Sequence, residues 1–304
     1  MSAVPLSAVA AAAYRHHAGT ATPDDHDVLE QVALQPLAGG LNNPLYRLRH
    51  DDRDLCLKLH RVDHHHRAAR EWLALTLLAH RGHPPAPRPV WRSDREDHPA
   101  IVMTFAAGTP LGGVRLQSRQ LDAVAAALAD LYRITPADVT GAVPLVATPA
   151  PAMLRRIQRT CTALTDPADP GQAPLIELWQ RWSTGPDPAL IRVPVPQVFG
   201  RGDPSLANLL WDGAELTLLD FEYAGWSDPA YELADLIEHP QSCATPDHAW
   251  HSLVDRFGFD PDARARHHAA RRMLALFWLA RRRPDDDRYH AQADRARRLL
   301  HDLP

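Results

Sequence analysis

The chain has 304 residues, of which 45% are hydrophobic and 23% are charged, and its formal net charge is −4 at pH 7. This length and apolar content allow a sizeable buried core in one large or two medium domains, whereas the slightly acidic balance argues against a dedicated nucleic-acid binder. Three widely spaced cysteines, Cys56, Cys161 and Cys243, favour a reducing compartment and no structural metal.

The N-terminus begins with an Ala-rich apolar run, MSAVPLSAVAAAAYRHH, which predicts a short helix. No basic residue precedes the run, so it makes a poor signal peptide, and no window approaches the roughly 18 apolar residues of a membrane span. We therefore expect a cytoplasmic monomer or homodimer whose partner is a small molecule, and which binds neither membrane nor nucleic acid.

Short strands with one inserted helix are predicted between about residues 28 and 105. Two of them, Leu45–Arg49 and Leu55–His60, flank the polar turn Asp51–Asp54 and predict a β-hairpin. The following segment HHHRAAREWLALTLLAHRG predicts a helix that ends at Gly82. The segments RPVWRS and PAIVMTF supply two more strands.

Lys58 lies in the second strand of this hairpin and is the only lysine, against 32 arginines. An ammonium is a compact point charge that fits a phosphate oxygen and a carboxylate together, so arginine would not replace it at such a site. On the predicted helix, Glu71 completes an apolar stripe with Ala68, Leu75 and Leu78, and a buried carboxylate needs a partner. We therefore expect Lys58 and Glu71 to pair; the alternatives are a lysine that snorkels to the surface and a carboxylate at the edge of the stripe.

Between the first two strands, the stretch AGGLNN includes Gly39, Gly40 and Asn42. Adjacent glycines let backbone amides approach a phosphate. A glycine turn ahead of a strand lysine is where a nucleotide triphosphate would be covered. Without that position, the two glycines would indicate only an ordinary turn.

Beyond about residue 108 the chain is mostly helical, with helices predicted near Ala152–Leu164 and Pro174–Trp182 and at Ser118–Tyr132. From Pro229 on, three or four helices are expected, one of which is stopped by Pro284. Aspartates interrupt the arginines at positions 281 to 283, 295, 297 and 298, so we interpret these arginines as surface residues rather than a nucleic-acid site.

The stretch RGDPSLANLL places Asp203 five residues before Asn208. The following WDGAELTLLDFE predicts a tight hairpin at Asp212–Gly213 that brings Asn208 and Asp220 to the same end of a strand pair. Two such oxygen ligands suit Mg²⁺, and Asp203 on the incoming loop could accept a hydrogen bond from a hydroxyl. An Asp-Pro turn followed by a buried asparagine is the alternative. An adhesion role for Arg201–Asp203 would require export, which nothing in the sequence supports.

Two stretches of the chain together resemble the signature region of the aminoglycoside phosphotransferase and choline kinase superfamily. They are GRGDPSLANLLW and the following LTLLDFEYAGWSDPAYELADL. Lys58, Glu71 and the linker IVMTFAAGTPL match that family in order and spacing, so the resemblance covers most of the chain. It implies an α+β, bilobal protein-kinase-like fold. Residues 1–107 would form a small β-sheet N-lobe with one key helix, and residues 108–304 a large, mostly helical C-lobe.

The resemblance also implies an ATP- and Mg²⁺-dependent phosphotransferase and roles for its residues. Asp203 would be the catalytic aspartate. Lys58 would contact the α and β phosphates, and Glu71 would hold Lys58. Asn208 and Asp220 would bind Mg²⁺.

Further positions follow from the same resemblance, with two departures. Glu222 would assist a metal or the substrate, and the linker backbone near Met103 and Phe105 would bind adenine. Arg201 stands where the family usually has histidine, and Thr104 stands where an acid is frequent. These departures leave the groups needed for transfer in place.

Residues 203–254 contain ten acidic residues and no lysine or arginine. A negative local potential would favour metal ions and a cationic acceptor, such as an aminoglycoside-, choline- or thiamine-like molecule. Trp226, Tyr231 and the intervening Asp228 could contact such a cation, although packing is the more frequent role of each aromatic. The alternative function is a nucleotide-binding regulator of the same fold with little or no catalysis.

Overall fold

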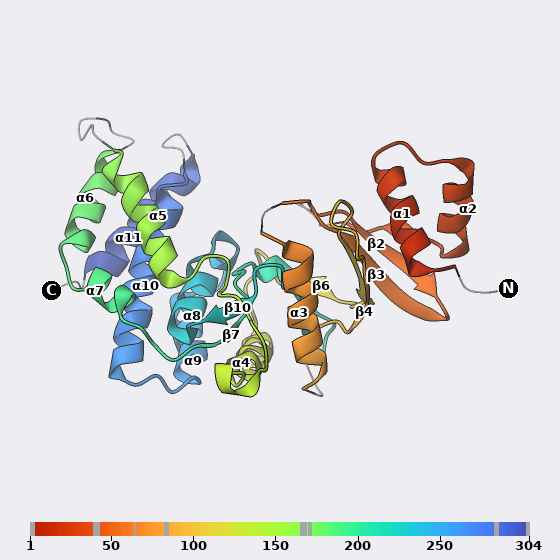
Figure 1. Cartoon of the computed structure of the whole chain (residues 1–304). Coiled ribbons are helices and arrows are strands. Elements are labelled where there is room, and N and C mark those ends of the chain that lie inside the picture. The colour runs from red at the N-terminus through yellow and green to blue at the C-terminus, as the bar shows by residue number, and fades with distance from the viewer. Residues whose placement is uncertain are drawn as a thin grey trace. The chain divides into compact units, whose positions relative to one another are not determined.

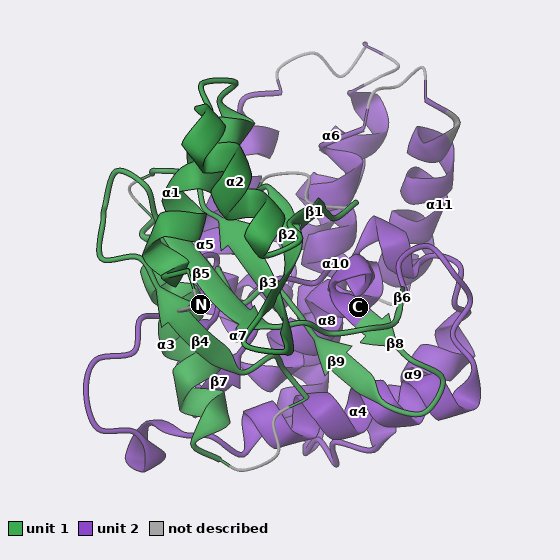
Figure 2. Cartoon of the chain, turned by 90° about the vertical axis from the view of Figure 1, so that its right-hand side faces the viewer, with its two compact units in different colours: residues 1–109, 210–223 green, residues 110–209, 224–304 purple. Residues whose placement is uncertain are grey.

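The structure is a computed structural model, which describes residues 4–38, 43–63, 65–81, 85–164, 169, 172–282 and 286–301 (Figure 1). The chain forms two compact units (Figure 2): a sheet unit of residues 1–109 and 210–223, and a helical unit of residues 110–209 and 224–304. Residues 210–223 therefore group with the N-terminal part, whereas the sequence suggested a single boundary after residue 107. No helix in the described ranges is long and apolar enough to cross a membrane.

An antiparallel five-stranded sheet forms the centre of the sheet unit, in the order β1-β2-β3-β5-β4. Its strands are β1 (Gln35–Pro36), β2 (Leu45–His50), β3 (Arg53–Leu59), β4 (Pro89–Arg92) and β5 (Ala100–Thr104). The predicted hairpin is confirmed as β2–β3, and its turn residues Asp51 and Asp52 have φ of 47° and 56°. Aspartate tolerates this left-handed region, which a tight two-residue hairpin turn requires. Lys58 is thereby placed in a central strand, opposite Leu45 of β2 and Ile101 of β5.

Helices cover both faces of this sheet (Figure 1). Because side chains alternate along a strand, the leucines of β3 face one side of the sheet and Lys58 faces the other. Helix α1 (Leu6–His17) packs against the leucine side and α2 (Pro23–Gln31) packs on α1, whereas α3 (Arg67–Ala79) contacts β4 and β5 and meets Lys58. The sequence predicted α1 and α3 but not α2, which begins with a capping box formed by Thr22 and Asp25.

Residues 210–223, which belong to the sheet unit, contain the turn of a second hairpin. The Asp212 carboxylate accepts hydrogen bonds from two following backbone N–H groups, both at 2.8 Å, and Gly213 has a φ of 110°, so the predicted turn is confirmed. The Leu218 N–H donates to the carbonyl oxygen of Pro85 at 2.6 Å, which ties the hairpin to the connection between α3 and β4. The strands concerned are β8 (Leu209–Trp211) and β9 (Leu216–Leu218), with β6 (Thr109–Pro110) beside β8.

The helical unit is built around α10, whose Ala270, Met273 and Leu274 are fully buried. The three helices predicted between residues 118 and 182 are confirmed to within two residues at each end. Helix α10 itself ends at Leu279; the predicted stop at Pro284 lies outside the described residues. The elements of the unit are α4 (Ser118–Tyr132), α5 (Ala150–Thr162), α6 (Ala173–Ser183), α7 (Asp187–Arg192), β7 (Val198–Gly200), β10 (Gly225–Ser227), α8 (Pro229–Glu238), α9 (Asp247–Asp255), α10 (Pro261–Leu279), α11 (Asp287–His301) and the 3-10 helices Pro136–Asp138, Leu206–Asn208 and Pro240–Ser242.

A partly buried ion network joins α8, α9, α10 and α11. Arg271 and Arg295 both donate to Glu238, at 2.7 and 2.5 Å, and to Asp247, at 2.9 and 3.1 Å. The surface interpretation was therefore wrong for Arg295, whose side chain is only 22% exposed. The acidic partners come from 48 and 57 residues earlier in the chain, so no local pattern indicated them.

Candidate functional site

Lys58 lies among three carboxylates in the sheet unit. Its Nζ is 2.7 Å from Glu71 Oε2, 2.6 Å from Asp220 Oδ1 and 3.4 Å from Glu222 Oε2, and its side chain is 7% exposed. Burial alone would lower the pKa of Lys58, but the three carboxylates raise it above its ordinary value. The ammonium is therefore charged, and the predicted contact between Lys58 and Glu71 is present.

Glu71 reaches Lys58 from the buried face of α3. Burial opposes ionisation of Glu71, but the charge of Lys58 and the imidazole of His60 outweigh it and lower the pKa of the carboxyl group. The second carboxylate oxygen accepts a hydrogen bond from the backbone N–H of Phe221 at 3.3 Å. Glu71 thus binds a strand side chain with one oxygen and the segment after β9 with the other.

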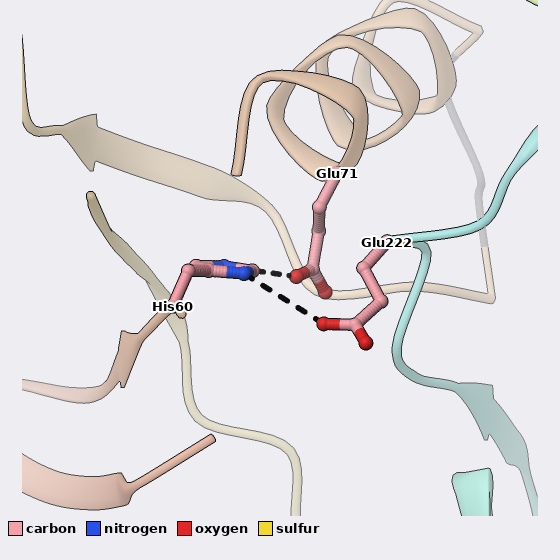
Figure 3. Close-up of side chains that lie close together, drawn as sticks. All are labelled: His60, Glu71 and Glu222. Atoms are coloured by element: carbon pink, nitrogen blue, oxygen red, sulfur yellow. Dashed lines mark ion pairs between the residues drawn. The ribbon is translucent and has the colours of Figure 1, made fainter. Parts of the chain in front are cut away.

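His60 lies between two of these carboxylates (Figure 3). Its Nε2 is 3.2 Å from Glu71 Oε2, its Nδ1 is 3.7 Å from Glu222 Oε2, and its side chain is fully buried. The three residues have ligand atoms spaced closely enough for a metal ion. The Lys58 ammonium already lies against both carboxylates, so a cation of the chain itself supplies the positive charge there.

Glu222 is buried and both of its carboxylate oxygens contact donors of the protein. Asn43 Nδ2 donates to Oε2 at 2.6 Å, and Arg67 Nη1 donates to Oε1 at 2.8 Å. The predicted role of Glu222 beside a metal or substrate stays a prediction. Asn43 belongs to the stretch AGGLNN that the sequence singled out, whereas no local pattern indicated Arg67, which lies 155 residues from Glu222.

Asp220 has a backbone conformation that few residue types adopt. Its φ is 62°, in the left-handed region that aspartate and asparagine tolerate better than other non-glycine residues. Burial raises the pKa of Asp220, Lys58 opposes that change, and Glu71 and Glu222 reinforce it. The carboxylate therefore gains from any further positive charge that comes close.

Asp203 and Asn208 lie together in the helical unit. Asn208 Nδ2 donates to Asp203 Oδ2 and the Ser205 N–H donates to Asp203 Oδ1, both at 2.8 Å. The 3-10 turn Leu206–Asn208 brings the asparagine back to the aspartate, which explains the five-residue interval. Because Asn208 and Asp220 belong to different units, their shared metal ion stays a prediction.

Arg201 is 3% exposed. It stands where the family that the sequence resembles usually has a histidine. Its Nη2 donates to the carbonyl oxygen of Ser205 at 3.2 Å, so its side chain closes the loop that contains Asp203. Glu232 Oε2 accepts from the backbone N–H groups of Arg201 and Gly202 at 3.2 and 3.3 Å. The loop is therefore held from both sides, by an arginine and by a carboxylate.

A cavity beside this loop has an acidic lining. Burial raises the pKa of Glu232, and burial together with Glu232 and Asp203 raises the pKa of Asp235. Arg201 is the cation among the lining residues. The cavity is lined by Leu128, Tyr132, Arg201, Gly202, Asp203, Pro204, Glu232, Asp235 and Leu236.

The predicted adenine-binding residues lie at the end of β5. Met103 is 6% exposed, and the Phe105 N–H donates to the carbonyl oxygen of Asp54 at 3.1 Å. The guanidinium of Arg47 lies 4.5 Å from the centre of the Phe105 ring. Binding of adenine at this linker stays a prediction, and the predicted phosphate turn with Gly39, Gly40 and Asn42 lies outside the described residues.

The residues predicted to contact the acceptor have packing and capping contacts. Tyr231 is 2% exposed in the core of the helical unit, and Trp226 is 9% exposed in β10. The Asp228 carboxylate caps α8 and binds Arg266 Nε at 2.6 Å. Their contact with an acceptor stays a prediction.

Comparison with known proteins gives one family and one fold. The model of the phosphotransferase enzyme family matches residues 33–267, and a comparison with curated protein sequences finds no match. A thermostable mutant of aminoglycoside phosphotransferase APH(4)-Ia, in a ternary complex with ADP and hygromycin B, has a TM-score of 0.59 and 17% identity, with 92% of this chain and 98% of that chain covered.

Two further solved structures are similar over most of the chain. A choline/ethanolamine kinase family protein from Mesorhizobium loti has a TM-score of 0.58 and 22% identity, with 89% of this chain and 88% of that chain covered. Macrolide 2'-phosphotransferase MphH from Brachybacterium faecium has a TM-score of 0.56 and 20% identity, with 89% and 93% covered. At such identities the likeness concerns the fold, and it confirms the predicted fold class.

Proposed function

Because this chain belongs to the phosphotransferase enzyme family, we propose that it transfers the γ-phosphoryl group of ATP to a hydroxyl group of a small molecule, with Mg²⁺ as the metal cofactor. The membership confirms the enzyme class predicted from the sequence, a small-molecule phosphotransferase. The observation that carries the proposal is the buried Lys58, whose ammonium lies 2.7 Å from Glu71 and 2.6 Å from Asp220.

In this proposal Lys58 binds the α and β phosphates of the nucleotide. Glu71 fixes the ammonium from one side, so that little side-chain freedom is lost when a phosphate oxygen binds. Arginine would present a broad fork instead of a compact charge. Bound ADP in the similar structure of APH(4)-Ia supports a nucleotide as the donor.

Asp203 is the proposed catalytic residue. Its carboxylate orients the acceptor hydroxyl and takes up its proton as the bond between that oxygen and the γ-phosphorus forms. The bond between the γ-phosphorus and the oxygen that bridges to the β-phosphate breaks, and ADP leaves with that electron pair. Hydrogen bonds from Ser205 and Asn208 to the two carboxylate oxygens set the orientation of Asp203, and positioning of this kind accounts for much of the catalysis of phosphoryl transfer.

Asp220 and Asn208 are the residues that would hold Mg²⁺. A carboxylate and an amide oxygen are ligands that this hard cation accepts, and the raised pKa of Asp220 indicates a carboxylate that gains from additional positive charge. When bound, Mg²⁺ would neutralise charge on the phosphates. Glu222 fits less well as a ligand, because Asn43 and Arg67 already donate to its two oxygens.

The proposed acceptor is a cation. Residues 203–254, which include Asp203, contain ten acidic residues and no lysine or arginine. A negative potential near the catalytic aspartate would concentrate a positively charged alcohol. Hygromycin B in the similar structure of APH(4)-Ia supports an aminoglycoside-like molecule as one candidate.

A coupled assay of ADP formation tests this function. The protein with ATP and Mg²⁺ is offered aminoglycosides, choline, ethanolamine, thiamine, neutral sugars and homoserine in parallel. We expect ADP formation that depends on one of the cationic alcohols and stops when EDTA is added. ADP formation with none of the alcohols, although the folded protein binds ATP, would contradict the proposed reaction.

A further inference from the structure

Helix α3 and the segment of residues 220–223 are joined at two places. One is the hydrogen bond from the Phe221 N–H to Glu71, one turn into the helix. The other involves Arg67, the first residue of α3, and it has no part in the function derived so far. Both joints lie within the sheet unit.

Arg67 makes more contacts with this segment than a surface arginine would. Its Nη1 donates to Glu222 Oε1 at 2.8 Å and to Tyr223 Oη at 2.7 Å, and its guanidinium lies 5.0 Å from the centre of the Tyr223 ring. Its Nε is 2.7 Å from Asp63 Oδ2, and its side chain is 15% exposed. The planar guanidinium thus meets two carboxylates and an aromatic ring at once, which lysine could not do.

The position of Arg67 at the start of α3 is unfavourable for the stability of that helix. A positive charge at a helix N-terminus opposes the helix dipole, and the first turn of α3 contains no acidic residue. His66 at the N-cap provides no side-chain hydrogen bond and has a left-handed φ of 49°. The start of α3 is therefore held by the contacts of Arg67, and such local violations occur mainly at functional sites.

Glu222 connects Arg67 to Lys58, the residue proposed to bind the phosphates. Its other oxygen is 2.6 Å from Asn43 Nδ2 and 3.4 Å from Lys58 Nζ (the carboxylate is drawn in Figure 3). Asn43 precedes β2 and accepts a hydrogen bond from the Arg61 N–H at 3.2 Å. With 1% exposure, Glu222 joins α3, β3 and the start of β2 at one buried charge.

We propose that Arg67 and Glu222 are positioning residues for nucleotide binding, and we call their ion pair the α3 clasp. The clasp holds the start of α3 against residues 220–223, so that Glu71 and Lys58 stay aligned for the phosphates. This inference rests on the proposed function. It also assigns Glu222 a role in the protein scaffold rather than in the metal site.

Binding of ADP, measured by calorimetry with and without Mg²⁺, tests the clasp without an acceptor. We expect Arg67→Lys and Glu222→Gln each to weaken ADP binding in EDTA by about tenfold, and the double variant to be little weaker than either, because both changes break one contact. The gain in affinity on adding Mg²⁺ should be the same as in the wild type.

The matched control is Arg15→Lys. Arg15 makes a two-pronged ion pair with Asp25 between α1 and α2 in the same unit, so this variant loses the same chemistry at a place away from Lys58. Its ADP affinity should equal that of the wild type. A purely structural role for Arg67 would lower the melting temperature as much but leave the ADP affinity of the folded variant unchanged, and that result would overturn the proposal.

Two other results are decisive. A Glu222→Gln variant that loses only the Mg²⁺-dependent gain, with Arg67→Lys like the wild type, would make Glu222 a metal ligand and refute the clasp. If the two charge variants do not fold, Tyr223→Phe removes one hydrogen bond of Arg67. A two- to threefold loss is expected, less than the full value of such a bond, because Glu222 still holds the guanidinium. No loss refutes the clasp. A wild-type protein that does not bind ADP at all would instead refute the proposed function, and the clasp with it.

Discussion

Replacing Lys58 by arginine isolates the geometry of the cation from its charge. The ammonium is held by carboxylate oxygens at 2.6 and 2.7 Å, and its side chain is 7% exposed. Arginine keeps the charge but is longer and planar, so it must displace Glu71 or Asp220 or bend away from the phosphates. Overpacking of this kind destabilises by about 1–3 kcal/mol.

The expected loss of transition-state stabilisation lies near the upper end of the range of the expected loss of stability. A shift of about 1 Å in a positioning group reduces a rate by ~10²-fold, which corresponds to about 2.7 kcal/mol of transition-state stabilisation. We therefore expect Lys58→Arg to remain folded while kcat/KM for ATP falls by roughly a hundredfold. Lys58→Met would instead leave buried carboxylates without their cation and destabilise the fold by about 3–5 kcal/mol.

The assay combines ATP turnover with a thermal unfolding curve for each variant. Turnover of Lys58→Arg within about threefold of the wild type, at equal stability, would refute the argument that the single lysine is required for its shape, since threefold is well below the effect expected of a misplaced group. Equal losses of stability for the arginine and methionine variants would also contradict it, because only one of them removes the charge.

Three further predictions follow from the same contacts. Asp220→Asn, which keeps the left-handed backbone accessible, should lower turnover by at least about a hundredfold at every Mg²⁺ concentration with little change in melting temperature; wild-type turnover in a Mg²⁺ titration contradicts it. Arg201→Ala removes the bond to the Ser205 carbonyl and should lower kcat about tenfold while ADP affinity is unchanged; equal changes in both would make Arg201 a general structural residue. Burial lowers the pKa of His267 from 6.5 to about 3. Below pH 6.5 the unfolded chain therefore binds a proton that the folded chain does not. The free energy of unfolding then falls toward pH 3 by up to ~1.4 kcal/mol per pH unit. His267→Gln should flatten this fall in urea unfolding between pH 7 and pH 4, and an unchanged slope would refute the assignment.

The sequence predicted those parts of the site that are marked by a rare residue type, by a regular spacing or by a short motif. Lys58 was found because it is the only lysine, and Glu71 because it interrupts an apolar stripe at helical spacing. The interval from Asp203 to Asn208 was visible as a motif, and its 3-10 turn gives it a physical reason. The hairpin β2–β3 followed from the alternation of its strands around a polar turn.

Contacts between distant residues left no such trace. Arg67 follows a run of histidines, of which His65 and His66 are exposed. Arg67 itself binds Glu222, which lies 155 residues later. The buried position of His60 depends on α3 and on the segment after β9 together. Helix α2 differs, since the Thr22–Asp25 capping box was readable in the sequence and was missed.

The most direct measurement of the central claim is the product of the reaction catalysed by the wild type and by Asp203→Asn. Each protein is incubated with ATP, Mg²⁺ and the panel of alcohols, and ADP and the acceptors are followed by mass spectrometry. The wild type should form one phosphorylated acceptor for each ADP, and the variant should form neither while it still binds ADP. Equal transfer by the variant, or ADP formed by the wild type without any phosphorylated acceptor, would contradict phosphoryl transfer at Asp203.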